Sequence, residues 1–400
     1  MTSFDAYFPT QGSENPFRTF SGVDQLTQTH LNDAKIQGVF ATATDLFALK
    51  SEFKEIRIKG LACLDSVKVE ELLHAKGRIL TRFSNLAQVK SEDSVILFNT
   101  DAEEVESEGE LRWTFHYVTG KNPKKIRAVG PVSLAKVTCP STSIGSVASV
   151  KSTIEAEECT IDSMFANKNI SLKDCRVDYC DTLEGKITII NKTALIAKYN
   201  LKAAIDIILK NVQADAGSEI TSGGKIEATD CVIQTIKAEN TIRLESSSCQ
   251  TATLNVSDEI GKVKLVSSKI LGDLIILTSK TRLLNFPSLQ TYKPTEFFEK
   301  YYTDETLKDG KTRTRHHPDG WRVFAKSEAD LKQIQFEAGS TGLVNGQPYK
   351  CMGPGAFVSL KASVLIKISG QGGKIGGQIL FKDCEGKFEL EDDVTIGARK

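Results

Sequence analysis

The chain has 400 residues, with 51 Lys plus Arg against 51 Asp plus Glu, so its formal net charge is zero. This balance excludes the bulk positive field that non-specific nucleic-acid binding needs, and we expect no nucleic-acid partner. No segment approaches the roughly 18 consecutive apolar residues of a transmembrane helix, so the sequence predicts no membrane span.

The N-terminal residues 1–15 contain no basic residue and no apolar run, and they are therefore not a secretory signal. The nine cysteines lack a paired framework spacing, which is typical of a reducing compartment. We predict a cytoplasmic protein. Export by a bacterial secretion system that needs no signal peptide stays open.

Residues 1–52 do not follow the pattern of the rest of the chain, and they include helix-compatible stretches between Val23 and Leu49. We predict that they form an N-terminal cap. A repeat array needs one, because the open strand edges of an uncovered terminal repeat pair with other chains.

Residues 53–285 carry a repeat. Between Ile154 and Val263, apolar anchor residues recur 16 to 21 residues apart, and the positions two and seven residues after each anchor are apolar or small. The anchors are Ile56, Ile79, Val95, Leu111, Val132, Ile154, Ile170, Ile187, Ile205, Ile226, Ile242 and Val263.

This spacing predicts the shape of one repeat. An anchor and the residue two positions later lie on one face of a strand, since side chains alternate with period two, and the five-residue step to the next inward position needs a corner. We therefore predict a mainly β fold, a right-handed parallel β-helix (solenoid) of about twelve or more coils with two or three short faces each.

The alternative fold is a sandwich of antiparallel strands. Such a sandwich should carry hairpin dipeptides between its strands. Only Asp309-Gly310, Asp319-Gly320 and Asn345-Gly346 have this form, and all three lie outside the repeat. The sequence therefore favours the solenoid.

Three cysteines, Cys159, Cys175 and Cys231, share the fifth position after their anchors. No Cys-x-x-Cys spacing accompanies them, so we interpret them as small buried side chains in a stack, without a metal. We predict neither a metal site nor a cofactor site in the chain.

Residues 286–354 break the repeat, and we predict an aromatic-rich insertion with short helices, one beginning at Pro294 and one over Ser327–Phe336. Residues 355–400 are predicted to return to β coils, because Ile379–Cys384 is close in sequence to Ile170–Cys175.

The insertion is the predicted place for a partner to bind. Aromatic and arginine side chains are enriched at interface hot spots. The candidate partner-binding residues are Arg313, Arg315, Trp321, Tyr301 and Tyr302. The alternative for the tyrosines is a buried seam, together with Phe297 and Phe298, of a helix that packs on the solenoid.

Two other sequence patterns can be explained without a metal-binding, catalytic or phosphate-binding site. Adjacent side chains such as His316 and His317 point apart in a strand or loop, so we predict an exposed polar loop there. The glycines of Gly370–Gly377 surround Lys374, but no Ser or Thr follows that lysine and no helix follows the segment, which favours a tight turn over a phosphate loop.

Carboxylates in the repeat raise the question of carbohydrate chemistry, because lyases and hydrolases with β-helix folds gather acidic residues on one face. The residues concerned are Asp174, Asp178, Asp181, Asp230 and Asp383. Lys192 and Lys210 fall near the same corner, and alternating charge at a solvated corner is the competing explanation.

The short apolar coil, with its Ile-x-Leu or Ile-x-Ile opening at Ile170 and Ile187, resembles bactofilin-type polymer-forming proteins over residues 56–280. That resemblance implies a cytoskeletal scaffold, although this chain has more coils and a predicted cap. We predict a non-enzymatic structural or interaction protein that binds a protein partner or self-associates, as a bacterial scaffold or effector. The alternative is a pectin-lyase-like enzyme or a glycan-binding protein.

Overall fold

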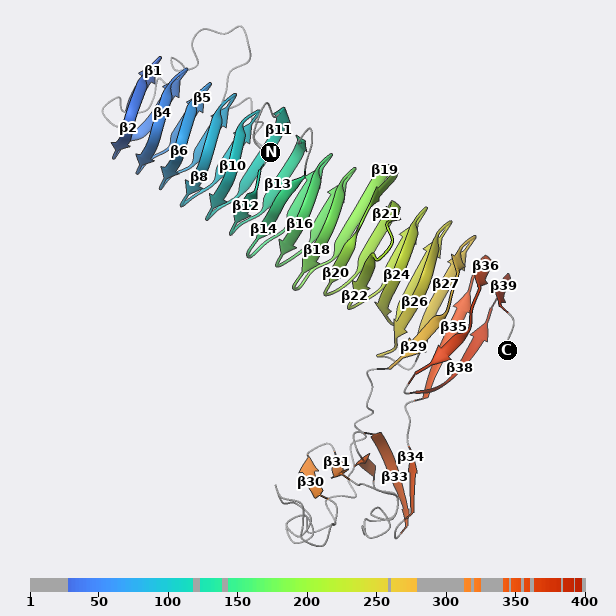
Figure 1. The fold of residues 1–400 in the computed structure, drawn as a ribbon. Coiled ribbons are helices and arrows are strands. Elements are labelled where there is room, and N and C mark those ends of the chain that lie inside the picture. The colour runs from blue at the N-terminus through green and yellow to red at the C-terminus, as the bar shows by residue number, and fades with distance from the viewer. Residues whose placement is uncertain are drawn as a thin grey trace. The chain divides into compact units, whose positions relative to one another are not determined.

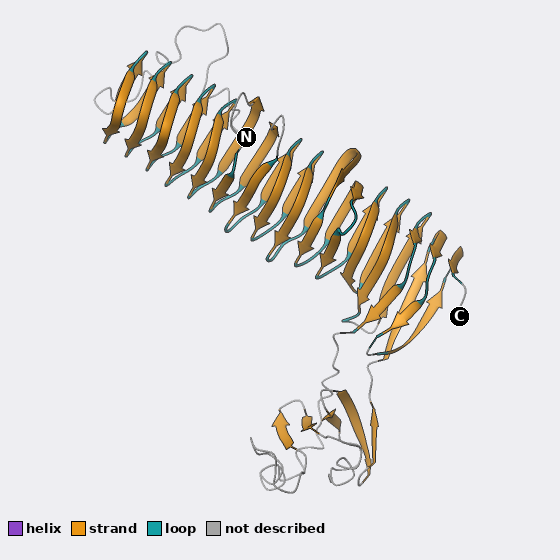
Figure 2. Cartoon of the chain, in the orientation of Figure 1, coloured by secondary structure: helices purple, strands orange, loops and turns teal. Residues whose placement is uncertain are grey.

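The structure is a computed structural model, and every element of secondary structure in the part that it describes is a strand (Figure 2). None of these residues forms a helix that could span a membrane. The described residues are 28–117, 123–138, 143–257, 260–278, 313–317, 320–324, 341–344, 347–353, 356–359, 363–382, 384–391 and 393–397.

The chain folds as a parallel β-solenoid of about 16 turns, which confirms the predicted fold class. It divides into two compact units. Unit 1 contains residues 1–223 and 228–234, and unit 2 contains residues 224–227 and 235–400. Strands β23 (Ile226–Thr229) and β24 (Val232–Glu239) fall at the division.

In unit 1, two sets of strands alternate along the chain, and each strand pairs in parallel with the strand of its set one coil later (Figure 1). The first set is β1 (Gln28–Asn32), β3 (Asp45–Leu49), β5 (Ala62–Asp65), β7 (Ile79–Arg82), β9 (Val95–Phe98), β11 (Leu111–Tyr117), β13 (Val132–Thr138), β15 (Ile154–Glu157), β17 (Ile170–Lys173), β19 (Ile187–Ala197) and β21 (Ile207–Ala214). The second set is β2 (Lys35–Thr42), β4 (Glu52–Ile58), β6 (Lys68–Ala75), β8 (Asn85–Ser91), β10 (Asp101–Ser107), β12 (Lys125–Ala128), β14 (Ile144–Ser149), β16 (Thr160–Ala166), β18 (Arg176–Thr182), β20 (Asn200–Ala203) and β22 (Glu219–Ser222).

A regular coil has three short faces, each with two inward side chains. In the coil that begins at Ile154 the buried pairs are Ile154 with Ala156, Cys159 with Ile161, and Met164 with Ala166. The inward positions therefore follow steps of two, three, two, three and two residues. Each step of two is one flat strand segment, and each step of three is a bend that carries the chain to the next face.

The first bend of most coils depends on one residue in the left-handed region. This residue stands four positions after the anchor, as Phe83, Asn99, Glu158 and Asp174 do, with φ between 43° and 53°. Non-glycine residues rarely adopt this conformation, and none of these four is glycine. The conformation interrupts the alternation of side chains, so the two consecutive residues at the corner, such as Glu157 and Glu158, both face outward.

The residue after this corner is buried and bonds across the coils. Ser84 Oγ accepts a hydrogen bond from Val67 N at 3.1 Å and donates one to Arg82 O at 2.9 Å. Ser268 Oγ makes the same two contacts, with Ser247 N at 3.0 Å and with Val266 O at 2.7 Å. At the bend a main-chain N–H of one coil is thus satisfied by a side chain of the next.

Unit 2 contains further coils and a separate sheet. The coil strands are β25 (Thr241–Glu245), β26 (Ser248–Asn255), β27 (Ile260–Val266), β28 (Lys269–Ile270), β29 (Leu274–Leu277), β35 (Ser363–Ser369), β36 (Gln371–Ile375), β37 (Ile379–Phe381), β38 (Glu385–Leu390) and β39 (Asp393–Ile396). Because β27 pairs with β35 and β29 with β37, the stack resumes directly after residues 279–362. The separate sheet is β30 (Arg313–His317), β31 (Gly320–Phe324), β32 (Thr341–Val344), β33 (Gln347–Gly353) and β34 (Ala356–Ser359).

Several expectations from the sequence need correction. Residues 28–49 are strands of the first coils, so the stack begins well before residue 53. The described residues of the insertion form strands, and both segments predicted as helices, at 294–302 and 327–336, lie outside the described residues. Strand β34, within the predicted C-terminal coils, belongs to the separate sheet.

In three coils the repeat was also assigned to the wrong residues. Ile56 pairs with Phe40 in the second set of strands, so the anchor of its coil is Leu46. Ile207 pairs with Ile187, whereas the predicted anchor Ile205 is 42% exposed. In unit 2, Ile379 pairs with Leu274 of β29, so Ile379–Cys384 is not equivalent to Ile170–Cys175. For Ile56 and Ile379 the apolar pattern belongs to a different face of the coil, and for Ile205 it is displaced by two residues.

Candidate interaction surfaces

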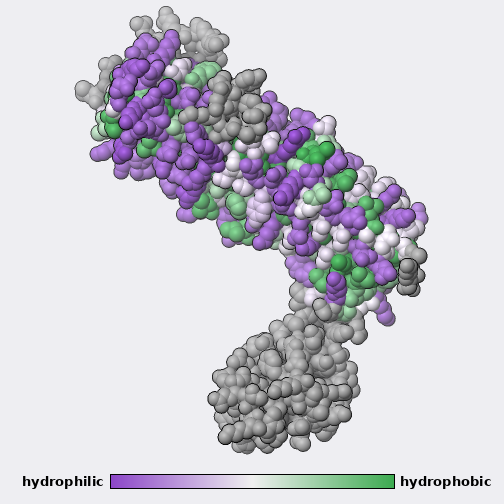
Figure 3. Space-filling model, viewed as in Figure 1, coloured by the Kyte–Doolittle hydropathy of each residue, from purple (hydrophilic) through white to green (hydrophobic). Residues whose placement is uncertain are grey.

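Exposed charges on the coils form pairs between neighbouring turns. Lys54 Nζ lies 3.4 Å from Glu71 Oε1, and Lys35 Nζ lies 3.1 Å from Glu52 Oε2. Exposed pairs of this kind stabilise a fold by less than about 1 kcal/mol each. Such pairs are typical of solvent-exposed faces, and Figure 3 shows hydrophilic residues over much of the visible surface of the first coils.

A groove of about 440 Å³ lies over the second set of strands. Four of its five glutamates have basic partners, and Glu104 accepts a hydrogen bond from Gln88 Nε2 at 3.3 Å. Glu55 bonds to Arg57, Lys68 Nζ lies 2.8 Å from Glu70, and Lys124 Nζ lies 3.0 Å from Glu103. Most of the negative charge in the groove is therefore balanced by neighbouring basic side chains.

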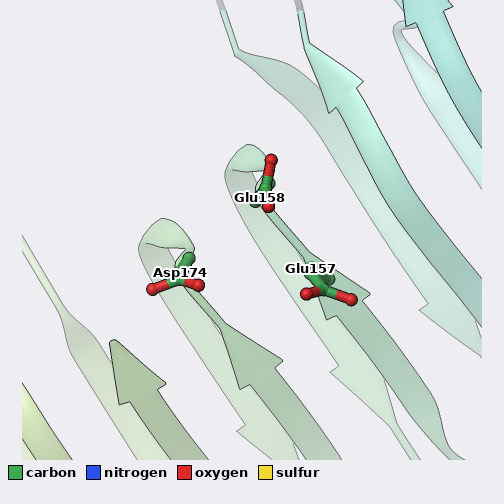
Figure 4. A group of neighbouring side chains, drawn as sticks. All are labelled: Glu157, Glu158 and Asp174. Carbon is green, nitrogen blue, oxygen red and sulfur yellow. The ribbon is translucent and has the colours of Figure 1, made fainter. Parts of the chain in front are cut away.

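One group of three carboxylates, Glu157, Glu158 and Asp174, lies at the first corner of two successive coils (Figure 4). Lysines balance it: Lys192 Nζ lies 3.0 Å from Asp174 and 3.9 Å from Glu158, and Lys173 Nζ bonds to Glu157. The main-chain N–H of Lys192, which donates to Asp174 Oδ1 at 2.6 Å, holds the pKa of Asp174 below its usual value. The group acts as a charge-paired corner.

The same corner explains the shared position of Asp174 and Asp230, which raised the question of carbohydrate chemistry. Both have a left-handed backbone, with φ of 52° and 53°, and Asp is one of the few non-glycine residues that tolerate it. Their equivalence in the repeat thus follows from backbone geometry. Asp383 lies outside the described residues.

The cysteines at the fifth position lie inside the coils. Cys159, Cys175 and Cys231 are all buried and free. The pKa of the Cys159 thiol is raised well above its usual value, first by its hydrogen bond with Cys175 and then by burial, and burial raises the pKa of Cys231 to about 11. A thiol that stays protonated is a poor nucleophile, and the positions serve packing and corner hydrogen bonds.

The predicted partner-binding residues lie partly in the separate sheet. Arg313 and Arg315 belong to β30 and Trp321 to β31, and the two strands pair antiparallel with His316 opposite Trp321. Tyr301 and Tyr302 lie outside the described residues. A docking role for these five residues stays a prediction. Lys374 lies on β36, which pairs with β28, so the glycine-rich segment belongs to strands and not to a phosphate loop.

Two surfaces were missed by reasoning from the sequence. The first consists of the end layers of the stack. Among the described strands, β1 pairs with β3 and β2 with β4. The inward residues Leu31 and Ile36 of this first layer are half-buried, whereas Phe53, the register partner of Ile36, is 1% exposed.

The last layer repeats this arrangement. Among the described strands, β38 pairs with β35 and β39 with β36. Ile396 is half-buried, whereas its partner Ile375 in the layer before is fully buried. Each end of the described stack thus leaves part of an apolar layer uncovered by a further coil.

The second missed surface, which we call the apolar face, consists of Phe47, Cys63, Leu80 and Ile96. These residues stand in register on β3, β5, β7 and β9, between the inward residues of each strand, and so point outward. Outward residues at the same position in later coils, such as Glu155 and Ser171, are polar and exposed. The signal in the sequence was an unbroken apolar run, such as Val95–Phe98, in place of alternation.

An ion pair borders the apolar face. Asp65 Oδ2 accepts hydrogen bonds from Arg82 Nη2 at 2.6 Å and Nε at 2.8 Å. The Arg82 guanidinium also lies 6.0 Å from the centre of the Phe83 ring, and Phe83 packs edge-on against Phe98. The border is therefore ordered by a charge pair, in which two guanidinium N–H groups donate to one carboxylate oxygen, and by aromatic contacts.

Comparisons with known proteins do not extend these observations: no family model, no curated protein and no solved structure matches the chain.

Proposed function

We propose that the protein is a non-enzymatic scaffold that self-associates end to end through the two end layers of its coils. The observation that carries the proposal is the pair of partly uncovered apolar layers, which contain Leu31 and Ile36 at one end and Ile396 at the other. A parallel coil can pair with a further coil of the same kind, because its strand edges offer a repeated set of N–H and C=O groups.

The two ends are different surfaces, so a contact between them is head to tail. Such a contact produces rings when the rotation closes and open filaments when it does not. The resemblance to bactofilin-type polymer-forming proteins supports filaments, and with it a cytoskeletal role in a bacterial cytoplasm. The exposed charge pairs, Lys54 with Glu71 among them, would keep the sides of such an assembly solvated.

Light scattering on the purified chain tests the proposal. We expect the mass to rise with concentration for the wild type. The substitution Ile36→Lys should return it to that of one chain with little change in melting temperature, because a charge would enter the buried layer of the assembly. Gln37→Lys is the matched control, since Gln37 is an exposed neighbour on the same strand.

Two outcomes would overturn the proposal. One is a single-chain mass for the wild type at every concentration. The other is release of products from polyuronides, which would establish the carbohydrate-active alternative. An Ile36→Lys variant that assembles as well as Gln37→Lys would remove the first layer from the contact.

A further inference from the structure

The residues of the apolar face point outward from the coils, yet three of the four are buried. Phe47 is 2% exposed, Cys63 6% and Leu80 3%, although each lies between two inward residues of its strand. Parallel strands that are covered on both sides show continuous apolar runs, and strands with one solvated side alternate. Both the burial and the sequence of β3, β5 and β7 therefore require a segment that lies over this face.

We propose that the N-terminal residues 1–27 of the same chain dock on the apolar face. The chain enters the first coil at Gln28, and β1 lies beside β3 on the same side of the coil. His30 stacks on Phe47 with ring centroids 5.0 Å apart and an angle of 14°. The segment that precedes β1 thus starts at the border of the face.

Length and composition of the segment fit this role. The face spans four strands at about 4.8 Å each, or roughly 15 Å, and 27 extended residues reach roughly 90 Å. The segment contains five aromatic residues with only four charged ones. The aromatic residues are Phe4, Tyr7, Phe8, Phe17 and Phe20. Aromatic side chains bury large areas when they pack on an apolar surface.

A groove beside the face offers a place for these side chains. It has a volume of about 340 Å³, and its lining includes Phe47, Leu61, Cys63, Leu80 and Arg78. Arg78 Nε is buried and makes no hydrogen bond. A buried donor without an acceptor is costly, and a carbonyl or carboxylate of the docked segment would satisfy it.

The reactivity of the Cys63 thiol shows whether the segment is docked on the apolar face. Its labelling rate by a maleimide can be measured in the full-length chain, with each cysteine identified by mass spectrometry after digestion. In the first variant, the five aromatic residues of the segment are replaced by serine. In the matched control, Thr2, Ser3, Thr10, Gln11 and Ser13 are replaced by alanine.

We expect Cys63 to react at least about tenfold faster in the aromatic variant than in the wild type, because exposure returns the thiol to water and to its ordinary reactivity. Cys180 and Cys249, which lie inside the coils, should stay protected in all three proteins. The control should match the wild type. Equal rates at Cys63 in the wild type and the aromatic variant, whether fast or slow, would overturn the proposal.

The contact is internal to one chain, so it does not depend on end-to-end association. Protection of Cys63 should be the same at low and high protein concentration. Protection that appears only at high concentration would identify a second copy as the occupant and would overturn the proposal. A benzophenone side chain in place of Phe20 gives a second test in an otherwise native chain. It should crosslink to the segment between Phe47 and Leu80 of its own chain.

Discussion

The main-chain N–H of Cys159 donates a hydrogen bond to Cys175 Sγ, 3.4 Å away in the next coil. Cys175 Sγ in turn lies 3.2 Å from the main-chain oxygen of Lys173 in its own coil. Serine makes the same two contacts at Ser84 and Ser268. The shared cysteine position in the sequence is therefore a position for a small side chain that can both accept and donate a hydrogen bond.

Replacement of this side chain should destabilise the fold by a predictable amount. In Ser84→Ala the buried N–H of Val67 loses its acceptor, and we expect the free energy of unfolding in urea to fall by about 1–3 kcal/mol. Ser84→Cys should cost less, because a thiol makes these contacts at the equivalent Cys175. Equal losses in the two variants would show that the hydrogen bond across the coils does not contribute.

The same substitution should change the free energy of unfolding very differently at two isoleucines that are separated by one residue. Ile207 is fully buried and Ile205 is 42% exposed. Ile207→Asp would place an unpaired charge in a stacked apolar layer, and we expect a loss of at least about 4 kcal/mol. Ile205→Asp should change the stability by about 0.5 kcal/mol or less. Melting temperatures in the reverse order would contradict the register of β19 and β21.

Alkaline pH should destabilise the protein through its buried thiols. Burial raises the pKa of Cys63 and Cys249 to about 12. An unfolded chain releases these protons above about pH 8.5, whereas the folded chain keeps them, so the unfolded state is favoured as pH rises. The free energy of unfolding should fall by up to about 1.4 kcal/mol per pH unit for each such thiol between about pH 9 and 11.

Urea titrations at pH 8, 9 and 10 measure this dependence. Cys249→Ala removes one of these buried thiols and should give a shallower fall in the free energy of unfolding. A slope that is unchanged by Cys249→Ala would contradict the assignment of the effect to this side chain.

The sequence predicted the fold because inward positions dominate its pattern. The pairs Ile154 with Ala156 and Ile170 with Leu172 stand in register in neighbouring coils, as their spacing indicated. The phase failed in the coil that holds Ile205. There, β19 extends through its corner and Tyr199 is packed into the core, so Ile187 and Ile207 are 20 residues apart. Alternation cannot distinguish Ile205 from Ile207, since both have the same parity.

The corner residues with a positive φ could not be predicted from the sequence, for a different reason. Glycine is the usual signal of a positive φ. Most of the corner residues are not even Asn or Asp, and Lys50, Phe83 and Glu158 occupy the same place with φ of 47°, 50° and 53°. The stack imposes this conformation, because the flanking strands must both pair with their neighbours. The residues around the corner therefore give little indication of its conformation.

The interaction surfaces could be predicted only in part. Unbroken apolar runs at Leu46–Leu49 and Val95–Phe98 indicated strands covered on both sides, but the search for anchors used only the inward positions. The end layers depend on where the stack begins, and helix-compatible composition between Val23 and Leu49 concealed the strands β1 to β3. Secondary structure there follows from pairing with later coils, which overrides local propensity.

Electron microscopy of the wild-type chain at increasing concentration tests end-to-end assembly most directly. We expect linear assemblies whose length increases with concentration. Ile36→Lys should leave only particles of the size of one chain under the same conditions. Wild-type particles of one length at every concentration, or association side by side that Ile36→Lys does not affect, would contradict a scaffold that assembles through its end layers.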